Sequence, residues 1–547
     1  MSERNHTHLP APVRTGKAIA LVAILLLAAA STATSQEKAD DGTARRIRDA
    51  ALNHSQVMDM VGYLTDAIGP RLTGSPNLKR AQEYALDKLR EWGLANVHLE
   101  AWGPFGRGWS LEGFSANMLS PGFSPLIAYP KAWSPGTAGT IRGESVFLDA
   151  KTVGELSKYE GKLKGKIVLF SPARHVDPLF EPPAQRRTDE ELRSLANAEP
   201  WHEPEPFRFT PEQRATEELN YAKWQLIQKE GAAVVLQPSF RDAGTVYVTS
   251  ATVPYPPDVP FEKRVGAWEL GKPAVPPQVV VSAEDYNRIV RLVERGIPVQ
   301  LEVNIAARFY DDDPMSYNVL AEIPGTDLKE QVVMIGGCID SWHAATGATD
   351  NAAGAATALE VMRILQSLGL RPRRTIRIGL WSAEEQGALG SRAYVAAHFG
   401  RKVAPANDQQ GQARLERKPE YETFDAYFNF DYGTGRIRGL FLQGNEEARP
   451  LFRELLEPVK ELGASTVSLA GVGASDHMSF DAIDLPGFQW IRDYMEGSNT
   501  RAPHTNMDTY DHVLGDDLKQ SAAVAAYIVY ALAMREEKVP RKPLPVQ

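Results

Sequence analysis

The sequence predicts an α/β fold, in which a mostly parallel central sheet is covered by helices and interrupted by an inserted β-rich domain. Between residues 315 and 535, apolar strand-like runs alternate with helical stretches, a pattern typical of buried parallel sheets. Between residues 125 and 305 the pattern changes to strand-like runs separated by Pro-rich and acidic stretches. At 547 residues, the chain is long enough for two or three folded units.

The charge balance disfavours several classes of partner. The formal net charge is −9, and the sequence has no run rich in lysine and arginine. Binding to nucleic acid or to an anionic membrane normally requires a basic surface. We therefore expect neither partner.

The N-terminus has the features of an export signal. Arg14 and Lys17 precede an apolar run over residues 18–30, and small residues follow at 33–35. The run is too short to span a bilayer comfortably. We expect residues 1–35 to be a signal peptide for export to the periplasm or the extracellular space, with no stable membrane insertion after its removal. An uncleaved membrane anchor is the alternative.

Helical periodicity marks residues 44–64 and 77–92, and the turn-rich string 69–76 separates the two helices. Strand-like runs follow at 166–170, 232–236 and 277–282, with a long Pro-rich and acidic excursion over 177–211. We expect residues 45–125 and 306–535 to form one domain and residues 126–305 to form the insertion.

Polar residues follow the strands predicted at 332–335, 375–381 and 426–430. Functional groups of parallel sheets collect at the carboxyl ends of the strands. The residues in these places are Cys338 and Asp340 after the first strand, Glu384 and Glu385 after the second, and Asp431 after the third. A helix is predicted over 352–368, and a further strand over 488–491.

Four segments carry the acidic residues and the histidine in a fixed order: GATDNAAG with Asp350, SAEEQG with Glu384 and Glu385, FNFDYG with Asp431, and APHTNMD with His504. Together they resemble the co-catalytic zinc exopeptidases, a family of secreted aminopeptidases and glutamate carboxypeptidases with a phosphorylase/hydrolase-like fold. The strings DSW and LGLRPRRTIRIGLWSAEEQG are most similar to the carboxypeptidase Q branch. The strings KIVLF, AAVVL and VVVSAEDY resemble the protease-associated domain inserted in some members.

The resemblance implies two zinc ions and a peptide substrate, either a dipeptide or a short peptide. Asp350 resembles the bridging ligand, with Glu385 and His504 completing one ion's site, and Asp431 and residue 338 completing the other. Glu384 resembles the general base that takes a proton from a metal-bridging water. The resemblance leaves aminopeptidase, carboxypeptidase and dipeptidase specificity open, as well as a homodimer.

Position 338 departs from the family pattern. Where the family has a histidine ligand in G-H-x-D-S, this chain has Cys338, followed by Ile339, Asp340 and Ser341. A thiolate can bind zinc, but it adds negative charge and has no N–H for Asp340, whose family counterpart accepts that proton from the ligand histidine. We therefore expect Asp340 to be partly without a partner. His343 is an alternative ligand.

Three outcomes stay open for the site: an active enzyme with a modified site, a slow or one-metal enzyme, and a catalytically impaired protein that binds peptides or a partner. The retained ligands favour the first two. Cyclisation of N-terminal glutamine with a single zinc is disfavoured by the intact glutamate pair.

Three further residues belong to segments that resemble the family. Asp508 is expected to orient the ligand His504 without binding the metal itself. Asp476 and His477 are expected to bind the substrate or stabilise the oxyanion. A helix cap with a packed histidine is the alternative for this pair.

Overall fold

The computed structural model describes residues 41–542, apart from residues 181, 203–206, 272–274, 404–413, 432 and 494–500. The described residues from Arg45 onward cluster as one compact unit. The predicted signal peptide, residues 1–35, lies outside the described residues. In the described part of the chain, no helix has both the length and the apolar character needed to cross a membrane.

The first sheet has eight strands in the order β1-β10-β12-β11-β15-β18-β16-β17. Its inner strands β12, β11, β15 and β18 run parallel, whereas β1, β10 and β16 are joined to it by antiparallel pairs. The prediction of a mostly parallel sheet is therefore confirmed for its centre. The bounds are β1 (Ala95–Trp102), β10 (Ser316–Ile323), β11 (Leu328–Cys338), β12 (Arg374–Trp381), β15 (Phe424–Asn429), β16 (Ile437–Phe441), β17 (Thr466–Ser468) and β18 (Gly487–Arg492).

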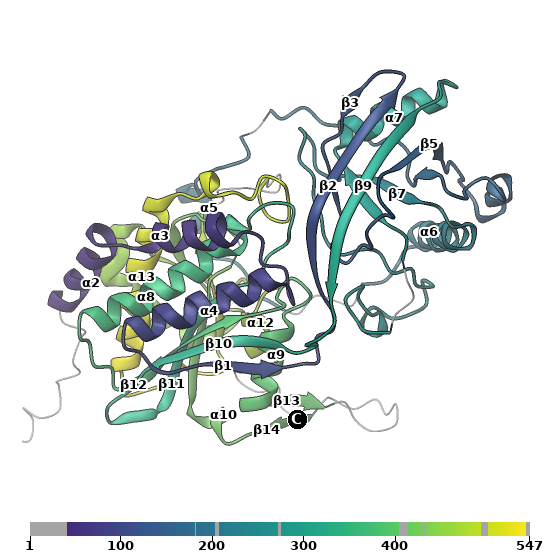
Figure 1. The fold of residues 1–547 in the computed structure, drawn as a ribbon. Coiled ribbons are helices and arrows are strands. Elements are labelled where there is room, and N and C mark those ends of the chain that lie inside the picture. The colour runs from purple at the N-terminus through teal and green to yellow at the C-terminus, as the bar shows by residue number, and fades with distance from the viewer. Residues whose placement is uncertain are drawn as a thin grey trace, which may run out of the picture. The chain divides into compact units, whose positions relative to one another are not determined.

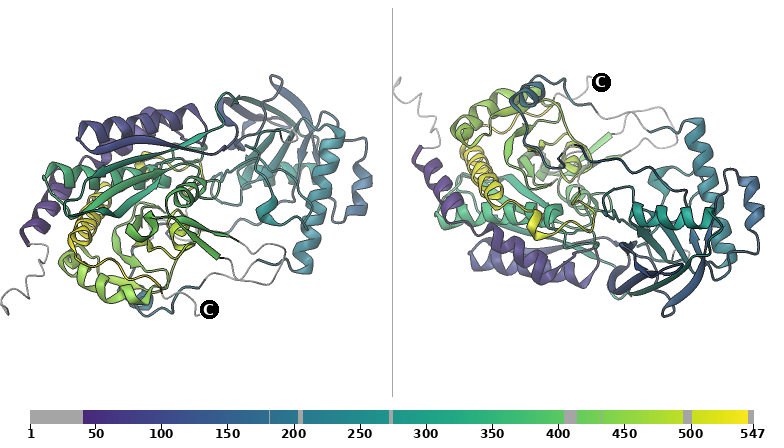
Figure 2. Two further views of the ribbon diagram at one scale, coloured as in Figure 1. Left: turned by 90° about the horizontal axis from the view of Figure 1, so that it is seen from below. Right: turned by 90° about the horizontal axis from the view of Figure 1, so that it is seen from above.

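Helices cover both faces of this sheet. Helices α8 (Ala353–Ser367) and α13 (Gly515–Met534) pack on β11 and β12, and α4 (Pro76–Glu91) packs on β1 and β10. Helices α4 and α8 lie side by side in Figure 1, and the purple α4 follows the sheet in both views of Figure 2. Further helices that contact the sheet or its covering helices include α3 (Val57–Gly62), α9 (Leu389–His398), α10 (Glu420–Thr423), α11 (Arg449–Leu456) and α12 (His477–Asp481).

The ends of these helices follow from local sequence. Helix α4 begins at Pro76 because the Ser75 hydroxyl caps the Leu78 amide and proline suits the first helical position. Helix α8 is buried on every side over Ala353–Leu365, and its small residues allow this close packing. The N-terminal helical stretch is divided into α2 (Asp41–Asn53), α3 and the π-helix η1 (Tyr63–Ile68).

The second sheet also has eight strands, in the order β3-β2-β9-β5-β6-β7-β8-β4. Strands β5 to β8 run parallel, and the long strands β2 and β9 pair antiparallel (Figure 1). The bounds are β2 (Gly108–Ser120), β3 (Ser124–Pro125), β4 (Ala128–Pro130), β5 (Ile141–Phe147), β6 (Ile167–Leu169), β7 (Val234–Pro238), β8 (Gln278–Val281) and β9 (Gln300–Tyr310).

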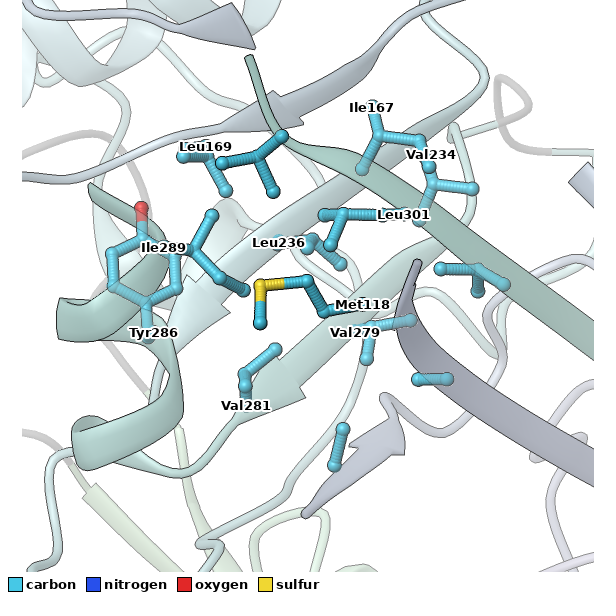
Figure 3. Close-up of a cluster of buried hydrophobic side chains, with 14 of the residues drawn as sticks. Met118, Ile167, Leu169, Val234, Leu236, Val279, Val281, Tyr286, Ile289 and Leu301 are labelled. Atoms are coloured by element: carbon cyan, nitrogen blue, oxygen red, sulfur yellow. The ribbon is translucent and has the colours of Figure 1, made fainter. Parts of the chain in front are cut away.

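The second sheet has its own hydrophobic core. Figure 3 shows strand residues such as Met118, Leu236 and Leu301 packed against Tyr286 and Ile289 of helix α7 (Ala283–Glu294). A separate cluster packs helix α6 (Pro211–Glu230) through Trp224 and Ile227. The strands of this sheet extend along the chain from Gly108 to Tyr310. Strand β2 therefore lies before the expected insertion of residues 126–305, and β9 runs past its end. The division into domains at those boundaries stays a prediction.

The excursion over residues 177–211 returns to the first sheet. We call residues 186–201 the strap. Arg186 of the strap forms ion pairs with Asp493 and Asp517, and the Trp201 amide donates to the Leu469 carbonyl at 2.9 Å. Helix α5 (Asp189–Ala196) packs on β17 between these contacts. Part of the inserted sequence therefore belongs structurally to the edge of the first sheet.

Candidate metal centre

The carboxyl ends of the parallel strands carry the predicted side chains. Cys338 is the last residue of β11, Glu384 and Glu385 follow β12, and Asp431 follows β15. Asp350 lies in an irregular turn before α8, and the Asp350–Asn351 peptide is cis. The structure groups six of the predicted residues into two clusters.

The first cluster contains Asp350, Glu385 and His504. His504 Nε2 lies 3.0 Å from Asp350 Oδ2 and 3.0 Å from Glu385 Oε2. Burial and the Asp350 carboxylate raise the pKa of Glu385. Burial alone would lower the pKa of His504, but the Glu385 and Asp350 carboxylates raise it well above its usual value. Two buried carboxylates held around one imidazole nitrogen are a favourable place for a cation.

The second cluster contains Cys338, Glu384 and Asp431, with one ligand atom of each within 4.8 Å of the others. Burial raises the pKa of the Cys338 thiol well above its usual value, and Asp431 and Glu384 raise it further. Burial also raises the pKa of Glu384, with Asp431 adding to the effect. We expected Asp350 to share this cluster, but Glu384 takes the third place in it.

Asp340 has more partners than expected. Its carboxylate accepts hydrogen bonds from the Thr73 hydroxyl at 2.9 Å and from the Glu384 and Glu385 amides at 3.2 and 3.4 Å. The expectation that Asp340 would be partly without a partner is wrong, because its role does not depend on an imidazole N–H at position 338. Asp340 instead fixes the backbone of both glutamates. Burial raises its pKa to about 6.

Asp508 does not orient His504. Its carboxylate accepts from the amides of Thr349 and Asp350 at 2.5 and 3.2 Å, so it holds the turn that carries Asp350. His504 Nδ1 instead lies 2.8 Å from the hydroxyl of Tyr247, a residue of the insertion. Tyr247 was not predicted as part of the site, since nothing in the sequence relates it to a histidine 257 residues away.

Asp431 is held by a chain of hydrogen bonds that all donate toward it. Trp381 Nε1 donates to the Tyr427 hydroxyl, which donates to Asn429 Oδ1, at 2.7 and 2.6 Å. Asn429 Nδ2 donates to the Ser475 hydroxyl at 2.7 Å, and Ser475 donates to Asp431 Oδ2. Such a chain keeps the carboxylate oriented.

Three other predicted residues lie outside both clusters. His343 is buried, with Nε2 2.8 Å from the Pro130 carbonyl and its ring against Trp109, so it is not an alternative ligand. Asp476 and His477 are fully buried and do not line the cavity described below. The expectation that they contact substrate is not supported, because His477 Nε2 is directed to the Val472 carbonyl.

Arg71 and two glycines determine the conformation of the loop after β11 and of the turn that carries Asp350. Arg71 is fully buried and donates to carbonyls that include those of Ile339 and Gly347 at 2.9 and 2.7 Å. Gly347 has φ +62°, and a Cβ there would lie 2.4 Å from Ser341. A Cβ on Gly354 would lie 2.6 Å from the Phe430 carbonyl. Larger residues at either position would displace the turn that holds Asp350.

A cavity of about 670 Å³ opens onto both clusters. Asp350, Asp431 and His504 line it, and Tyr247 and Leu195 of the insertion contribute to its wall. This volume lies in the range of small-molecule sites. The fold and the two clusters together define the class of a metal-dependent hydrolase.

Comparison with known proteins indicates which family of hydrolases the chain resembles. Residues 318–529 match the model of peptidase family M28. Carboxypeptidase Q of Homo sapiens is 26% identical over 484 residues, which cover 88% of this chain and 86% of that protein. Leupeptin-inactivating enzyme 1 of Streptomyces exfoliatus is 25% identical over 308 residues, covering 52% and 64%.

Two solved structures share the fold. The peptidase M28 precursor of Shewanella amazonensis has a TM-score of 0.63 at 23% identity, over 93% of this chain and 99% of that chain. The zinc aminopeptidase BSAP of Bacillus subtilis has a TM-score of 0.52 at 18% identity, over 89% and 97%. The match over residues 318–529 and the similarity to carboxypeptidase Q over most of the chain support peptidase family M28 and a metallo-exopeptidase.

Proposed function

We propose that the protein is an exported zinc exopeptidase that hydrolyses dipeptides or short peptides and binds two zinc ions. The observation that carries the proposal is the first cluster, in which one imidazole nitrogen lies 3.0 Å from each of two buried carboxylates. The family match and the name of the zinc aminopeptidase BSAP support the metal and the substrate class.

The residues of both clusters fit zinc. Imidazole nitrogen, carboxylate oxygen and thiolate sulfur are the donors that zinc takes in proteins. Glu385 Oε1 is buried without a hydrogen-bond partner among the described residues, as expected for an atom reserved for a ligand. We assign Asp350, Glu385 and His504 to one ion, and Cys338 and Asp431 to the other. Zinc bound there would polarise the scissile carbonyl and make a water acidic.

Glu384 is the proton carrier in this proposal. It accepts a proton from the attacking water and returns it to the leaving amine. Burial raises its pKa, which makes its carboxylate a stronger base than an exposed one. Asp340 fixes its backbone through the Glu384 amide, so the carboxylate is held ready beside the cavity.

Glu384→Gln tests the proposal. We expect the zinc-loaded variant to lose at least about a thousandfold in kcat on a dipeptide, since proton transfer to nitrogen then has no carrier. Glu447→Gln, at an exposed position of the short 3₁₀-helix Glu446–Ala448, is the matched control and should keep full activity. Zinc-dependent hydrolysis that persists in Glu384→Gln contradicts the mechanism.

The role of Cys338 is tested by metal content and a spectrum. Wild-type protein refilled with cobalt should bind two ions and show a thiolate-to-cobalt charge-transfer absorption, which Cys338→Ala should lack. Cys338→His should keep two ions without that absorption. If wild-type protein binds one ion or none and turns over no peptide, the alternative of a catalytically impaired, peptide-binding member is favoured.

A further inference from the structure

An exposed aromatic side chain of the insertion lies directly beside two residues that line the cavity. Phe240, in the loop after β7, is 55% exposed. A single exposed apolar residue is common on protein surfaces, so this exposure alone indicates nothing. Phe240 is distinguished by its neighbours Arg241 and Tyr247, which both belong to the cavity wall.

Both neighbours contact the Phe240 ring. The ring centroids of Phe240 and Tyr247 are 4.2 Å apart, and Arg241 Cζ lies 4.9 Å from the Phe240 centroid. Phe240 itself is not part of the cavity wall. A half-exposed ring that packs on two wall residues lies where the wall meets the outer surface. Phe240 therefore belongs to the rim of the cavity.

This rim is close to the metal centre. Tyr247 also packs on His504, with 5.3 Å between the ring centroids. Two ring contacts, of 5.3 and 4.2 Å, therefore connect the predicted ligand His504 to Phe240. An extended peptide advances about 3.3 Å per residue, so the separation between the two rings is no longer than about three residues of such a peptide.

Hydrogen bonds fix the loop that carries Phe240. The buried Ser239 hydroxyl accepts from the Arg241 and Tyr247 amides, both at 3.1 Å. Arg174 Nε and Nη2 donate to the Ser239 and Phe240 carbonyls at 2.8 and 2.9 Å. The Phe240 backbone is thus already in place before a ligand binds, and an aromatic side chain has few rotamers to lose. Both features lower the entropic cost of binding at this ring.

The cavity is too small to enclose a long peptide. Its volume of about 670 Å³ is that of a site for a drug-sized ligand, comparable to a dipeptide or tripeptide. An exopeptidase cleaves near one end of its substrate, so the rest of a longer peptide extends out past the rim. Phe240 can therefore contact only the part of the substrate that the cavity does not hold.

We propose that Phe240 is a specificity-determining residue, which binds an aromatic side chain about three residues from the scissile bond of a peptide substrate. The proposal rests on the peptidase function above and specifies its substrate. Aromatic rings attract each other at centroid distances of about 4.5–7 Å, in addition to the apolar area that they bury. The substrate ring lies on the C-terminal side of the bond if the enzyme removes N-terminal residues, and on the N-terminal side if it removes C-terminal residues.

The test compares three tetrapeptides: tetraalanine, trialanyl-phenylalanine and phenylalanyl-trialanine. Only cleavage that releases alanine is counted, because the aromatic ring is then far from the bond. For zinc-loaded wild-type protein we expect kcat/KM to be about tenfold higher for one phenylalanine peptide than for tetraalanine. Preference for trialanyl-phenylalanine places the ring on the C-terminal side, and preference for phenylalanyl-trialanine places it on the N-terminal side.

Phe240→Ala should abolish this preference. Phe240→Leu, which keeps an apolar side chain against Tyr247, should also lose most of it, because the ring is absent. Phe123→Ala is the matched control, since Phe123 is exposed in the turn between β2 and β3 and does not line the cavity. The preference is a ratio measured within one protein, so a change that affects all substrates equally cancels.

Two results would overturn the proposal while leaving the peptidase function intact. One is turnover of alanyl-alanine by wild-type protein with no preference among the tetrapeptides, or with no cleavage of them. The other is a Phe240→Ala variant that keeps the full preference. If that variant also binds zinc more weakly, Phe240 only supports Tyr247.

A binding measurement distinguishes failure of this proposal from failure of the peptidase function. In calorimetry, zinc-loaded Glu384→Gln protein should bind one phenylalanine peptide about tenfold more tightly than tetraalanine, and the double variant with Phe240→Ala should not. This result without turnover by wild-type protein would support binding at Phe240 and reject the peptidase function. Equal affinities in Glu384→Gln, or a preference that persists in the double variant, would reject binding at Phe240 whatever the turnover.

Discussion

His343 is a buried imidazole that the fold keeps neutral. Its ring lies 4.9 Å from that of Trp109, its Nε2 lies 2.8 Å from the Pro130 carbonyl, and burial lowers its pKa to about 4. The unfolded chain binds a proton at this side chain below pH about 6.5, whereas the folded protein does so only near pH 4. The associated stability is therefore present above pH about 6.5 and is lost as the pH falls toward 4.

Replacing His343 with glutamine should remove this part of the pH dependence. Between pH 7 and pH 5, metal-free wild-type protein should lose about 2 kcal/mol more stability than metal-free His343→Gln, in urea denaturation of both proteins. His54→Gln, at an exposed histidine, is the control and should behave as wild type. Identical pH profiles for wild type and His343→Gln would show that the imidazole titrates alike in both states.

At the residue scale, the sequence predicted the positions of the candidate ligands better than those of the residues that hydrogen-bond to them. Cys338, Glu385 and Asp431 lie where the strand pattern placed them, because a strand end fixes the position of the next few residues. Thr73 and Tyr247 bond to Asp340 and His504 across more than 250 positions in the chain. No periodicity links such distant residues, so only the folded structure brings them together.

At the scale of elements, a short segment of the insertion pairs with the loop of His504. The Val248 amide donates to the His504 carbonyl at 2.8 Å, and the Val246 amide donates to Asn506 Oδ1 at 2.7 Å. Between them Tyr247 bridges to Thr505 and places its hydroxyl 2.8 Å from His504 Nδ1. When Nε2 binds a metal ion, the proton of the neutral ring is on Nδ1, which then donates to the Tyr247 hydroxyl.

Tyr247→Phe should therefore weaken the metal site without changing its ligands. We expect zinc affinity to fall about 10- to 100-fold, measured by competition with a chelator. Tyr255→Phe removes a hydroxyl that bonds to Val265 elsewhere in the insertion, and zinc affinity should not change. Wild-type zinc affinity in Tyr247→Phe would mean that the backbone pairing alone holds the imidazole.

The elements themselves were predictable where the pattern was long. The strands and helices over 332–381 match the predicted ranges within a few residues, since buried apolar runs there are uninterrupted. Strand β2 was not predicted, because it mixes buried and exposed residues without regular alternation. From the sequence, the strap was recognised only as part of a Pro-rich and acidic stretch. Its packing on β17 could not be predicted, because β17 lies more than 250 residues further along the chain.

For the whole molecule, the concentration of buried carboxylates makes stability depend on metal. Four of them belong to the two clusters, and Asp340 lies directly beside the glutamate pair. Burial raises the pKa of Glu384, Glu385 and Asp340, so keeping these groups ionised without a cation is unfavourable.

Removal of metal should lower the thermal stability at pH 7.5, and added zinc should restore it. At a zinc concentration a hundredfold above Kd, the gain is about 2.7 kcal/mol per site. The measurement is a thermal melt of chelator-treated protein titrated with zinc, with magnesium as the control ion because it prefers all-oxygen sites. Equal melting temperatures in chelator and in zinc would argue against metal at these clusters.

The pairing of Tyr247 with the loop of His504 limits how this protein can be engineered. Cutting out the insertion, or exchanging it for that of a relative, would change a contact of a predicted ligand and the wall of the cavity in one step. A successful chimera would have to carry residues 245–248 and 504–506 from the same parent. The insertion is therefore not an interchangeable module, and selection acting on the metal site also constrains its sequence.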